Sequence, residues 1–505
     1  MPVTASSPWA VLVENRSAAE RAARAEAAEL RAQLAERDRS IVLLAEENAA
    51  LRDRLDRMAE QLAELQRRLG QNSRNSSKPP SSEGYAKPSP RSRREVTDRP
   101  TGGQPGHEGR TLRQAGKPDE RVIHRPGACV GCGALLADAP VTSTEARQIF
   151  DLPDIRLRVV EHVLEHRRCD CGQITMAAAP AGVAAPASSG PGLHGLAVYL
   201  LAAQHLPLAR TAELLAELCG ATVSQGTLAA WYAAAAAALE PFTQAVADQL
   251  AEAEVLGADE TGARVAGGLA WIHALRTDRL TLYSVWPGRG TEAMRAAGVL
   301  PRLAPDTVLV HDCWAPYWTF PVTHAVCGAH LLPELAAAAE VGGQAGWAEG
   351  LDRLLCEINA TTIAARAAGA DRLAPRLLAG YRRRYDQYIA AGWAANPGHT
   401  PGGCGRRRRP AHVNLLDRLD GHRDEVLRFT EDLPVPLTNN GSEQDVRPVK
   451  IRMKIAGCLR TMTGAEAFCR LRSYLSTARK HDQTGFTVLR MLADGTPWMP
   501  AQQMS

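Results

Sequence analysis

A heptad repeat of apolar residues near the N-terminus constrains the fold of this chain more than any other feature. Twelve positions, spaced alternately by four and three residues, run from Leu30 to Leu69, and ten of them are large and apolar. Asn48 interrupts a heptad slot that is otherwise aliphatic, and one buried Asn there favours a fixed register and a dimer. The pattern predicts a coiled coil over residues 15–70 through which copies of the chain associate. A long helix packed on its own domain is the alternative.

The next segment, residues 71–122, is rich in Ser, Pro, Gly and Arg, a composition that cannot build a packed core. Between Lys87 and Arg125, ten Lys or Arg stand against five Asp or Glu. We expect a flexible basic linker that can follow a phosphate backbone. A linker that is merely solvated explains the composition equally well.

The overall composition narrows the class of protein. With 505 residues, 45% of them hydrophobic, the chain can form several cores. The net charge of +4 is too small to indicate a partner. Because no run approaches the ~20 apolar residues of a membrane helix, and no signal peptide is recognisable, we expect a soluble cytoplasmic protein with no membrane partner. Eleven cysteines in a reducing compartment then favour metal ligation or buried thiols over disulfides.

Two cysteine pairs follow the linker. Cys129 and Cys132 form a CxxC motif, Cys169 and Cys171 form a CxC motif, and a glycine follows each pair. Such pairs close tetrahedral zinc sites, in which four thiolates leave no open position for catalysis. We predict a structural Zn²⁺ in a small zinc-binding domain over residues 123–185, with a strand-like stretch at residues 155–169. The alternative ligands are His124, His162 and His166.

The alanine-rich residues 190–250 predict a helical domain. A helix, a turn at Gly220 and a second helix capped by Ser224 or Thr227 suit a helix-turn-helix that enters a DNA groove. An ordinary helical hairpin has the same pattern.

The remainder predicts a catalytic core over residues 251–450. Three consecutive strands, a helix, a strand that ends at Asp312 and a strand that leads into a helix describe a ribonuclease H-like α/β arrangement, with a helical insertion at about 341–431. Residues 451–505 are predicted as a C-terminal helical basic segment. The fold class is therefore multidomain α+β: coiled coil, zinc-binding domain, helical DNA-binding domain and ribonuclease H-like core.

Asp259 and Asp312 each end a predicted apolar strand, so their carboxylates can converge on one edge of a sheet. Hard oxygen ligands suit Mg²⁺ or Mn²⁺, and a pair of such ions can activate water or a 3′-hydroxyl for in-line attack on phosphate. Two turn aspartates at strand ends are the alternative.

A third metal ligand is expected from a later helix, where Glu443, Glu334 and Asp445 compete on chemistry alone. Glu260 is disfavoured because adjacent strand residues face opposite ways. Glu443 also has a structural interpretation, since Asn440 as N-cap with Glu443 at the third helical position forms a capping box in all but the Ser or Thr.

Several stretches together resemble the transposases of the insertion sequence 66 family, whose members carry a DDE catalytic triad. In chain order they are "NSRNSSKPPSS", "GGQPGHEGR", the two cysteine pairs, "ADETG", "HDCWAPYW", "CGAHLLPEL", "TNNGSEQDVRPVK" and "GCLRTMTGAEAFCRLRSYLSTARKH". The resemblance covers most of the chain from about Leu30. It implies Asp259, Asp312 and Glu443 as the triad and as the Mg²⁺ or Mn²⁺ ligands, beside a structural Zn²⁺. The chain departs from the family in its CxC pair and in Met453, where several members have Arg.

The resemblance implies a DNA transposase of a bacterial insertion sequence, associated with the nucleoid. Such an enzyme binds the terminal inverted repeats of its element, cuts the strands and joins a 3′-hydroxyl to target DNA. Its expected partners are element ends, target DNA, further copies of itself and accessory proteins of the same element. A DNA-binding protein that does not cut, and a structure-selective nuclease that does not join, are the rival interpretations.

Basic residues near the triad are predicted DNA contacts. Arg447, Lys450 and Lys454 follow Glu443 and can clamp phosphates close to it. The run Arg406, Arg407, Arg408 and Arg409 can add a non-specific backbone contact. A solvated loop is the alternative for that run.

Overall fold

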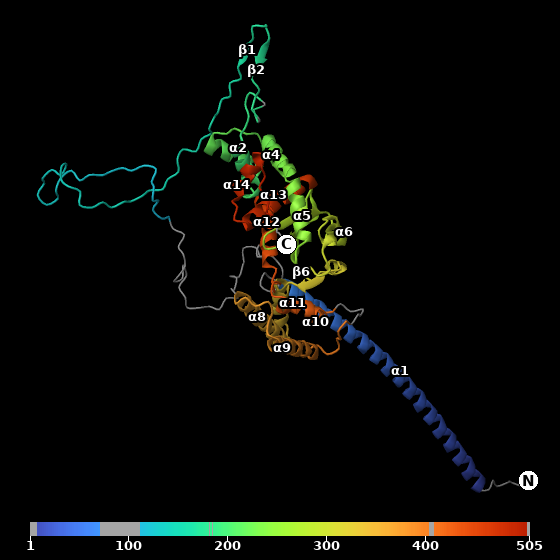
Figure 1. Cartoon of the computed structure of the whole chain (residues 1–505). Coiled ribbons are helices and arrows are strands. Elements are labelled where there is room, and N and C mark those ends of the chain that lie inside the picture. Colours follow the sequence, from blue (N-terminus) through green and yellow to red (C-terminus); the bar gives the residue numbers. More distant parts are fainter. Residues whose placement is uncertain (1–7, 71–111, 181, 184, 403–408, 502–505) are drawn as a thin grey trace, which may run out of the picture. The chain divides into compact units, whose positions relative to one another are not determined.

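The computed structural model describes residues 8–70, 112–180, 182–183, 185–402 and 409–501 (Figure 1). The chain divides into two compact units, residues 1–90 and residues 91–505.

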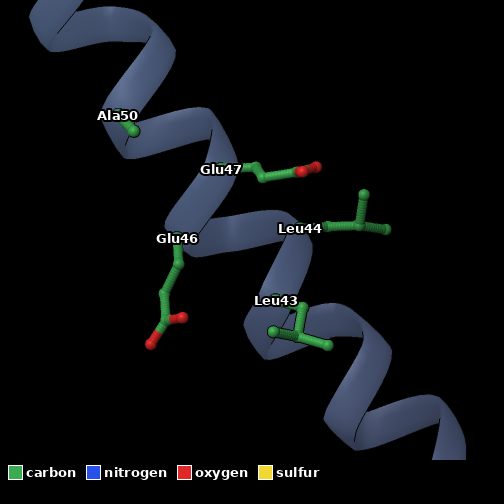
Figure 2. Close-up of a pocket in the computed structure, with 5 residues that line it drawn as sticks. All are labelled: Leu43, Leu44, Glu46, Glu47 and Ala50. Carbon is green, nitrogen blue, oxygen red and sulfur yellow. The ribbon is translucent and has the colours of Figure 1, made fainter.

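The first unit contains one helix of 63 residues, α1 (Pro8–Gly70), shown in blue in Figure 1. The heptad residues whose side chains the structure describes are exposed in the single chain, with Leu34 at 63% and Leu55 at 64%. The amide of Asn48 donates to the carbonyl of Leu44 in its own helix, at 2.9 Å. Figure 2 shows Leu44 and Glu47 projecting from the same side of α1, beside a surface hollow that this helix alone forms.

The second unit begins with a segment that contains the two cysteine pairs and little regular structure. Its only named strands in the described residues form one antiparallel hairpin around the second pair, β1 (His166–Arg168) and β2 (Ile174–Met176). The strand predicted from residue 155 is wrong for residues 155–165, which have no strand structure and are mostly exposed. In the described part of the unit no strand pairs with that stretch, so its alternation of apolar and polar residues does not lead to a sheet.

Four helices follow the segment with the cysteine pairs: α2 (Pro191–Ala202), α3 (Leu208–Cys219), α4 (Gln225–Ala238) and α5 (Glu240–Ala251). As predicted, α3 ends at Gly220, whose φ of 66° suits a glycine, and the hydroxyl of Ser224 caps α4 by accepting the N–H of Thr227 at 3.0 Å. No Lys or Arg lies between Gly220 and Glu240, so α4 presents no cation to a phosphate backbone.

A five-stranded mixed sheet forms the centre of the second unit, in the order β5-β4-β3-β6-β7. The first three strands pair in antiparallel fashion, and β3, β6 and β7 pair in parallel. The succession of three strands, a helix, a strand and a strand that leads into a helix was predicted from the sequence. The bounds are β3 (Val255–Val265), β4 (Gly268–Arg276), β5 (Thr281–Trp286), α6 (Thr291–Ala296), β6 (Val308–His311) and β7 (Thr323–Val326).

The alternate residues of β6 contact apolar clusters on the two faces of the sheet. Val308 and Val310 pack in an apolar cluster with residues of the helices that follow β7, whereas Leu309 belongs to the cluster on the other face. The helical region predicted at 341–431 is observed, with a gap in the description at residues 403–408. Helix α7 (Gly328–Ala339) precedes that region, which contains α8 (Ala345–Ala367), α9 (Pro375–Ala394), α10 (Ala411–Gly421) and α11 (Arg423–Glu431).

The last three helices return to the sheet and to the first helices of the unit. Leu471 and Val488 share one apolar cluster with Val198, Phe242 and Leu256, so the chain's end packs with residues 190–250. Figure 1 shows the last two of these helices, in red, beside the green α2 and α4. The three helices are α12 (Asn440–Ile455), α13 (Met462–Lys480) and α14 (Gly485–Ala493).

Candidate active site

Asp259 and Asp312 come from neighbouring parallel strands. Gly257 of β3 lies opposite Val310 of β6 in the last pair of this ladder, and each aspartate follows two residues later. The prediction that Asp259 ends its strand is wrong, because β3 continues to Val265. What ends before Asp259 is the pairing of β3 with β6, so the two acids lie where the edge of β3 becomes free.

A turn in an uncommon conformation holds Asp312. Cys313 has a φ of 68°, in the left-handed region that non-glycine residues rarely adopt. The N–H of Trp314 donates to Oδ1 of Asp312 at 3.0 Å, and the N–H of Cys313 donates to Nδ1 of His311 at 3.1 Å. Because Nδ1 of His311 accepts, its Nε2 carries the proton and donates to Nδ1 of His324, 3.0 Å away. Burial lowers the pKa of His311 to about 3, which keeps this supporting pair neutral.

The Asp259 carboxyl has no ion-pair partner among the described residues, and its Oδ1 accepts the N–H of Glu260 at 2.8 Å. Burial raises the pKa of Asp259 to about 7, and the charges of Glu260 and Asp312 add to that effect while His330 opposes it. A carboxylate that resists ionisation beside two other acids suits a bound cation. Its hard oxygen donors fit Mg²⁺ or Mn²⁺.

Glu260 faces away from Asp259, as strand alternation requires, but it is part of the same site. Its side chain is 1% exposed, and the hydroxyl of Tyr317 donates to Oε2 at 2.5 Å. Arg289 donates from Nε to Oε1 at 2.7 Å, and its Nη2 lies 3.4 Å from Oδ2 of Asp312. Sequence reasoning missed this arginine. The signal was a lone basic residue between two glycines, in the loop directly after a strand of the core.

The segment before α12 is anchored between the two aspartate strands. The side-chain amide of Asn439 donates to the carbonyls of Ala258 at 3.3 Å and Val310 at 3.5 Å. Gly257 leaves room for this contact, since a Cβ there would meet Oδ1 of Asn439 at 2.6 Å. The anchor therefore bonds the residue before Asp259 and the strand that leads to Asp312.

Glu443 is the fourth residue of α12, just after this anchor. The predicted capping box is wrong, because Asn439 and not Asn440 is the N-cap and its side chain makes no cap hydrogen bond. The side-chain amide reaches the strands instead, and its Oδ1 accepts the hydroxyl of Ser442 at 2.6 Å. The side chain of Glu443 lies outside the described set. Among the described side chains, no three His, Cys, Asp or Glu are grouped to hold an ion.

The two competitors of Glu443 have other partners. Oδ2 of Asp445 lies 3.1 Å from Nζ of Lys480 and 3.4 Å from Nε of Arg276. Glu334 pairs with Arg418 of α10. Both carboxylates thus join elements of the fold, and neither is placed with Asp259.

The predicted DNA contacts lie in different settings. Arg447 and Lys454 are exposed on α12, and Lys450 is half-buried, with Nζ donating to the carbonyl of Gly262 at 3.3 Å. Burial lowers the pKa of Lys450, and the charge of Asp259 opposes that shift. Arg409 pairs with Asp417 at 3.2 Å. Arg406, Arg407 and Arg408 lie outside the described residues.

The cysteine pairs form two similar turns. Cys129 accepts the N–H of Gly133 and Cys169 accepts that of Gly172, each on its carbonyl, and both glycines have positive φ. Backbone N–H groups that bond to the sulfurs of Cys129 and Cys169 lower the pKa of each thiol. Each turn thus favours a thiolate, as a zinc ligand requires. The structure does not bring the two pairs together, since no group of three ligands occurs in the described residues.

The alternative zinc ligands stay outside both turns. His166 lies at the start of β1, and His124 and His162 are exposed in irregular segments. In the described part of the chain, no helix is long and apolar enough to cross a membrane.

Comparison with known protein families identifies three matching regions. The model of the zinc-finger binding domain of transposase IS66 matches residues 126–172, which include all four cysteines. A family of unknown function (DUF6444) matches residues 14–113. No curated protein matches the chain. The model of the Transposase IS66 family matches residues 187–467, and because this is more than half of its length, the chain belongs to the IS66 family of transposases.

Proposed function

We propose that this protein binds the terminal inverted repeats of its insertion sequence, cuts DNA there and joins the resulting 3′-hydroxyl to target DNA. Asp259, Asp312 and Glu443 are the catalytic triad. The observation that carries the proposal is the parallel register of β3 and β6, whose last pair, Gly257 and Val310, stands two residues before each aspartate. The Asn439 anchor, which starts α12 beside the same strands, supports Glu443 as the third member.

The three carboxylates would hold Mg²⁺ or Mn²⁺, which supplies charge stabilisation to the attacking and leaving oxygens in phosphoryl transfer. We further propose that the sheet is ribonuclease H-like. Its three antiparallel strands followed by two parallel strands support this assignment. Asp259 lies on β3, Asp312 directly follows β6, and Glu443 lies on the later helix α12, so the sheet would position two acids and the helix the third.

Basic residues on α12 would bind DNA near the triad. Arg447 and Lys454 are exposed and can reach phosphates, and Lys450 bonds to Gly262 of β3, the strand that carries Asp259. Of the arginine run, Arg409 is held by Asp417, so Arg406, Arg407 and Arg408 are left as the proposed backbone contacts.

Two further parts of the chain complete the proposal. The zinc segment, with Cys129, Cys132, Cys169 and Cys171 as ligands, would contribute to recognition of the element ends. The helices of residues 190–250 share a core with α13 and α14, so they would present DNA-binding loops on a rigid body. The exposed seam of α1 would pair two chains as a coiled coil and bring two element ends together.

A labelled duplex from the element's own end tests the proposal in Mg²⁺. The full chain is expected to cut the duplex and give joined product. Glu443→Gln is expected to bind like the parent and to lose both steps, whereas Glu334→Gln retains them because its carboxylate pairs with Arg418. Cleavage without joining by the parent would support a nuclease, and binding without cleavage would support an end-binding protein. Normal joining by Glu443→Gln would refute the triad.

A further inference from the structure

Arg289 lies on the loop between β5 and α6, at the edge of the acid site. Its guanidinium carbon is 3.9 Å from the centre of the Trp314 ring and 4.8 Å from that of Trp271. Trp271 is on β4 and Trp314 follows Asp312, so two different elements fix the plane of one cation. Such stacking pre-organises a side chain that would otherwise lose much rotamer freedom on binding.

The nitrogens of the guanidinium differ in their contacts. Nε and Nη2 both approach Oε1 of Glu260, at 2.7 and 2.5 Å, and the buried Glu260 is itself held by Tyr317. The contact of Nη2 with Asp312 is longer, at 3.4 Å. Among the described residues Nη1 has no acceptor, and the side chain is 31% exposed. One edge of the cation is therefore fixed to the protein and another is turned outward.

This arrangement fits a phosphate better than it fits a structural ion pair alone. Asp259, Glu260 and Asp312 bring three acidic groups close together at this site, an arrangement that disfavours a polyanion, so DNA needs a fixed cation at that place. The two N–H groups of Nη1 are left to donate charge-assisted hydrogen bonds to phosphate oxygens. Glu260 and the two indoles would hold Arg289 while it does so, because their contacts use its other edge and its faces.

We propose that Arg289 binds a backbone phosphate of the DNA strand that enters the acid site, next to the phosphate that is cut. The inference rests on the proposed function. It adds a DNA-contacting residue outside α12 and gives Glu260, Tyr317, Trp271 and Trp314 the task of positioning it.

The test uses the full chain and a set of element-end duplexes, each with one neutral methylphosphonate in place of one phosphate across the end. Binding is measured in EDTA, which separates phosphate contact from cleavage, and cleavage is measured in Mg²⁺. A methylphosphonate at one position is expected to weaken the affinity of the parent protein for the duplex by about tenfold, as loss of a charged hydrogen-bonded contact does. Arg289→Ala is expected to bind the unmodified duplex about tenfold more weakly and to show no further loss at that position.

Two variants exclude a general effect. Arg289→Lys keeps the charge but loses the planar fork, so it is expected to bind better than Arg289→Ala and to cut more slowly than the parent. Arg384→Ala removes an arginine that pairs with Glu357 on α8 and lies 6.0 Å from a tyrosine ring, and it is expected to behave like the parent. The proposal is wrong if every methylphosphonate lowers the affinity of Arg289→Ala by the same factor as that of the parent. It is also wrong if Arg289→Ala binds and cuts the duplex normally.

The binding measurement also separates the two proposals. If the parent protein binds the duplex but never cuts it, the proposed function is refuted. The phosphate contact of Arg289 would still be identified if Arg289→Ala and one methylphosphonate each weaken binding and their effects do not add. Should Arg289→Ala fail to fold by circular dichroism, the comparison is made with Arg289→Gln, which keeps a polar side chain and removes the charge. Retained sensitivity of that variant at every position would overturn the assignment.

Discussion

The side-chain amide of Asn439 donates a hydrogen bond to the carbonyl of Ala258, the residue before Asp259. One polar side chain thus connects the start of α12 to the strand that carries the first acid. The backbone N–H of Asn439 also donates to Sγ of Cys327 at 3.1 Å, which ties the same point to the start of α7. The distance between Glu443 and the aspartates therefore depends on a buried anchor and not on the length of the helical insertion.

Removal of this anchor is expected to cost both stability and activity. Asn439→Ala leaves the carbonyls of Ala258 and Val310 without that donor, so we expect a loss of about 1–3 kcal/mol in the free energy of unfolding. Denaturant unfolding measures it. Cleavage at temperatures where the variant is folded should fall more than binding does. Asn396→Ala is the control, because Asn396 is buried with Gln344 in the helical layer and should lower stability without changing the cleavage rate of the folded enzyme.

The buried carboxyl of Asp259 predicts a stability that depends on pH in metal-free protein. Its pKa is raised from its ordinary value of 3.8 to about 7, so the folded state binds more protons than the unfolded state between these values. Stability from this group is therefore complete below pH 4 and is lost as the pH rises through 7. Asp259→Asn should raise the melting temperature in EDTA more at pH 8 than at pH 4.

Divalent metal should reverse that difference. Mg²⁺ is expected to stabilise the parent at pH 8 by binding the ionised carboxylate, and to stabilise Asp259→Asn less. Thermal melts at matched ionic strength measure both effects. Equal stabilisation of the two proteins by Mg²⁺ would show that Asp259 is not a ligand.

The cysteine turns predict one zinc ion for each chain. We expect Cys129→Ser and Cys169→Ser each to lower the bound zinc measured by elemental analysis, since each removes one thiolate from a four-thiolate site. Cys458→Ser is the matched control, because Cys458 is exposed between α12 and α13. Full zinc content in both turn variants would contradict the assignment and would return His124, His162 and His166 as ligands.

Leu43 and Leu44 give an internal control for the coiled coil. Both are about equally exposed on the single helix, at 63% and 57%, but only Leu44 lies in the heptad seam. Leu44→Glu should therefore reduce self-association by placing a charge in the seam, and Leu43→Glu should leave it unchanged. Analytical ultracentrifugation of the full chain distinguishes them. Equal effects of the two substitutions would favour a helix that packs in some other way.

The order of elements could be predicted from the sequence because each strand of the core carries a short apolar run bounded by turn residues. The turn at Gly220 and the Ser224 cap were predicted for the same local reason. The stretch from residue 155 was misread because its alternation of apolar and polar residues has no partner strand in the described structure. The local sequence pattern therefore predicts where a helix or strand lies, but it fails where the structure depends on a partner strand.

The candidate site was only half visible in the sequence. Asp259 and Asp312 stood out as acids at apolar runs, whereas Glu443 could be separated from Glu334 and Asp445 only through the family resemblance. Arg289 was missed because its partners lie on other elements, at separations of 29 residues to Glu260 and 23 to Asp312. The helix start was placed one residue late because Asn439 is engaged by two strand carbonyls, which no local capping rule anticipates.

The packing of α14 against the helices of residues 190–250 has a consequence for synthesis. Val488 and Leu489 cover Val198 and Ala202, which the ribosome produces almost three hundred residues earlier. A nascent chain cannot close this core until its last helix has emerged. A premature stop before Gly485 would leave those side chains in water, so shortened products are expected to be degraded and not to persist as end-binding competitors of the complete enzyme.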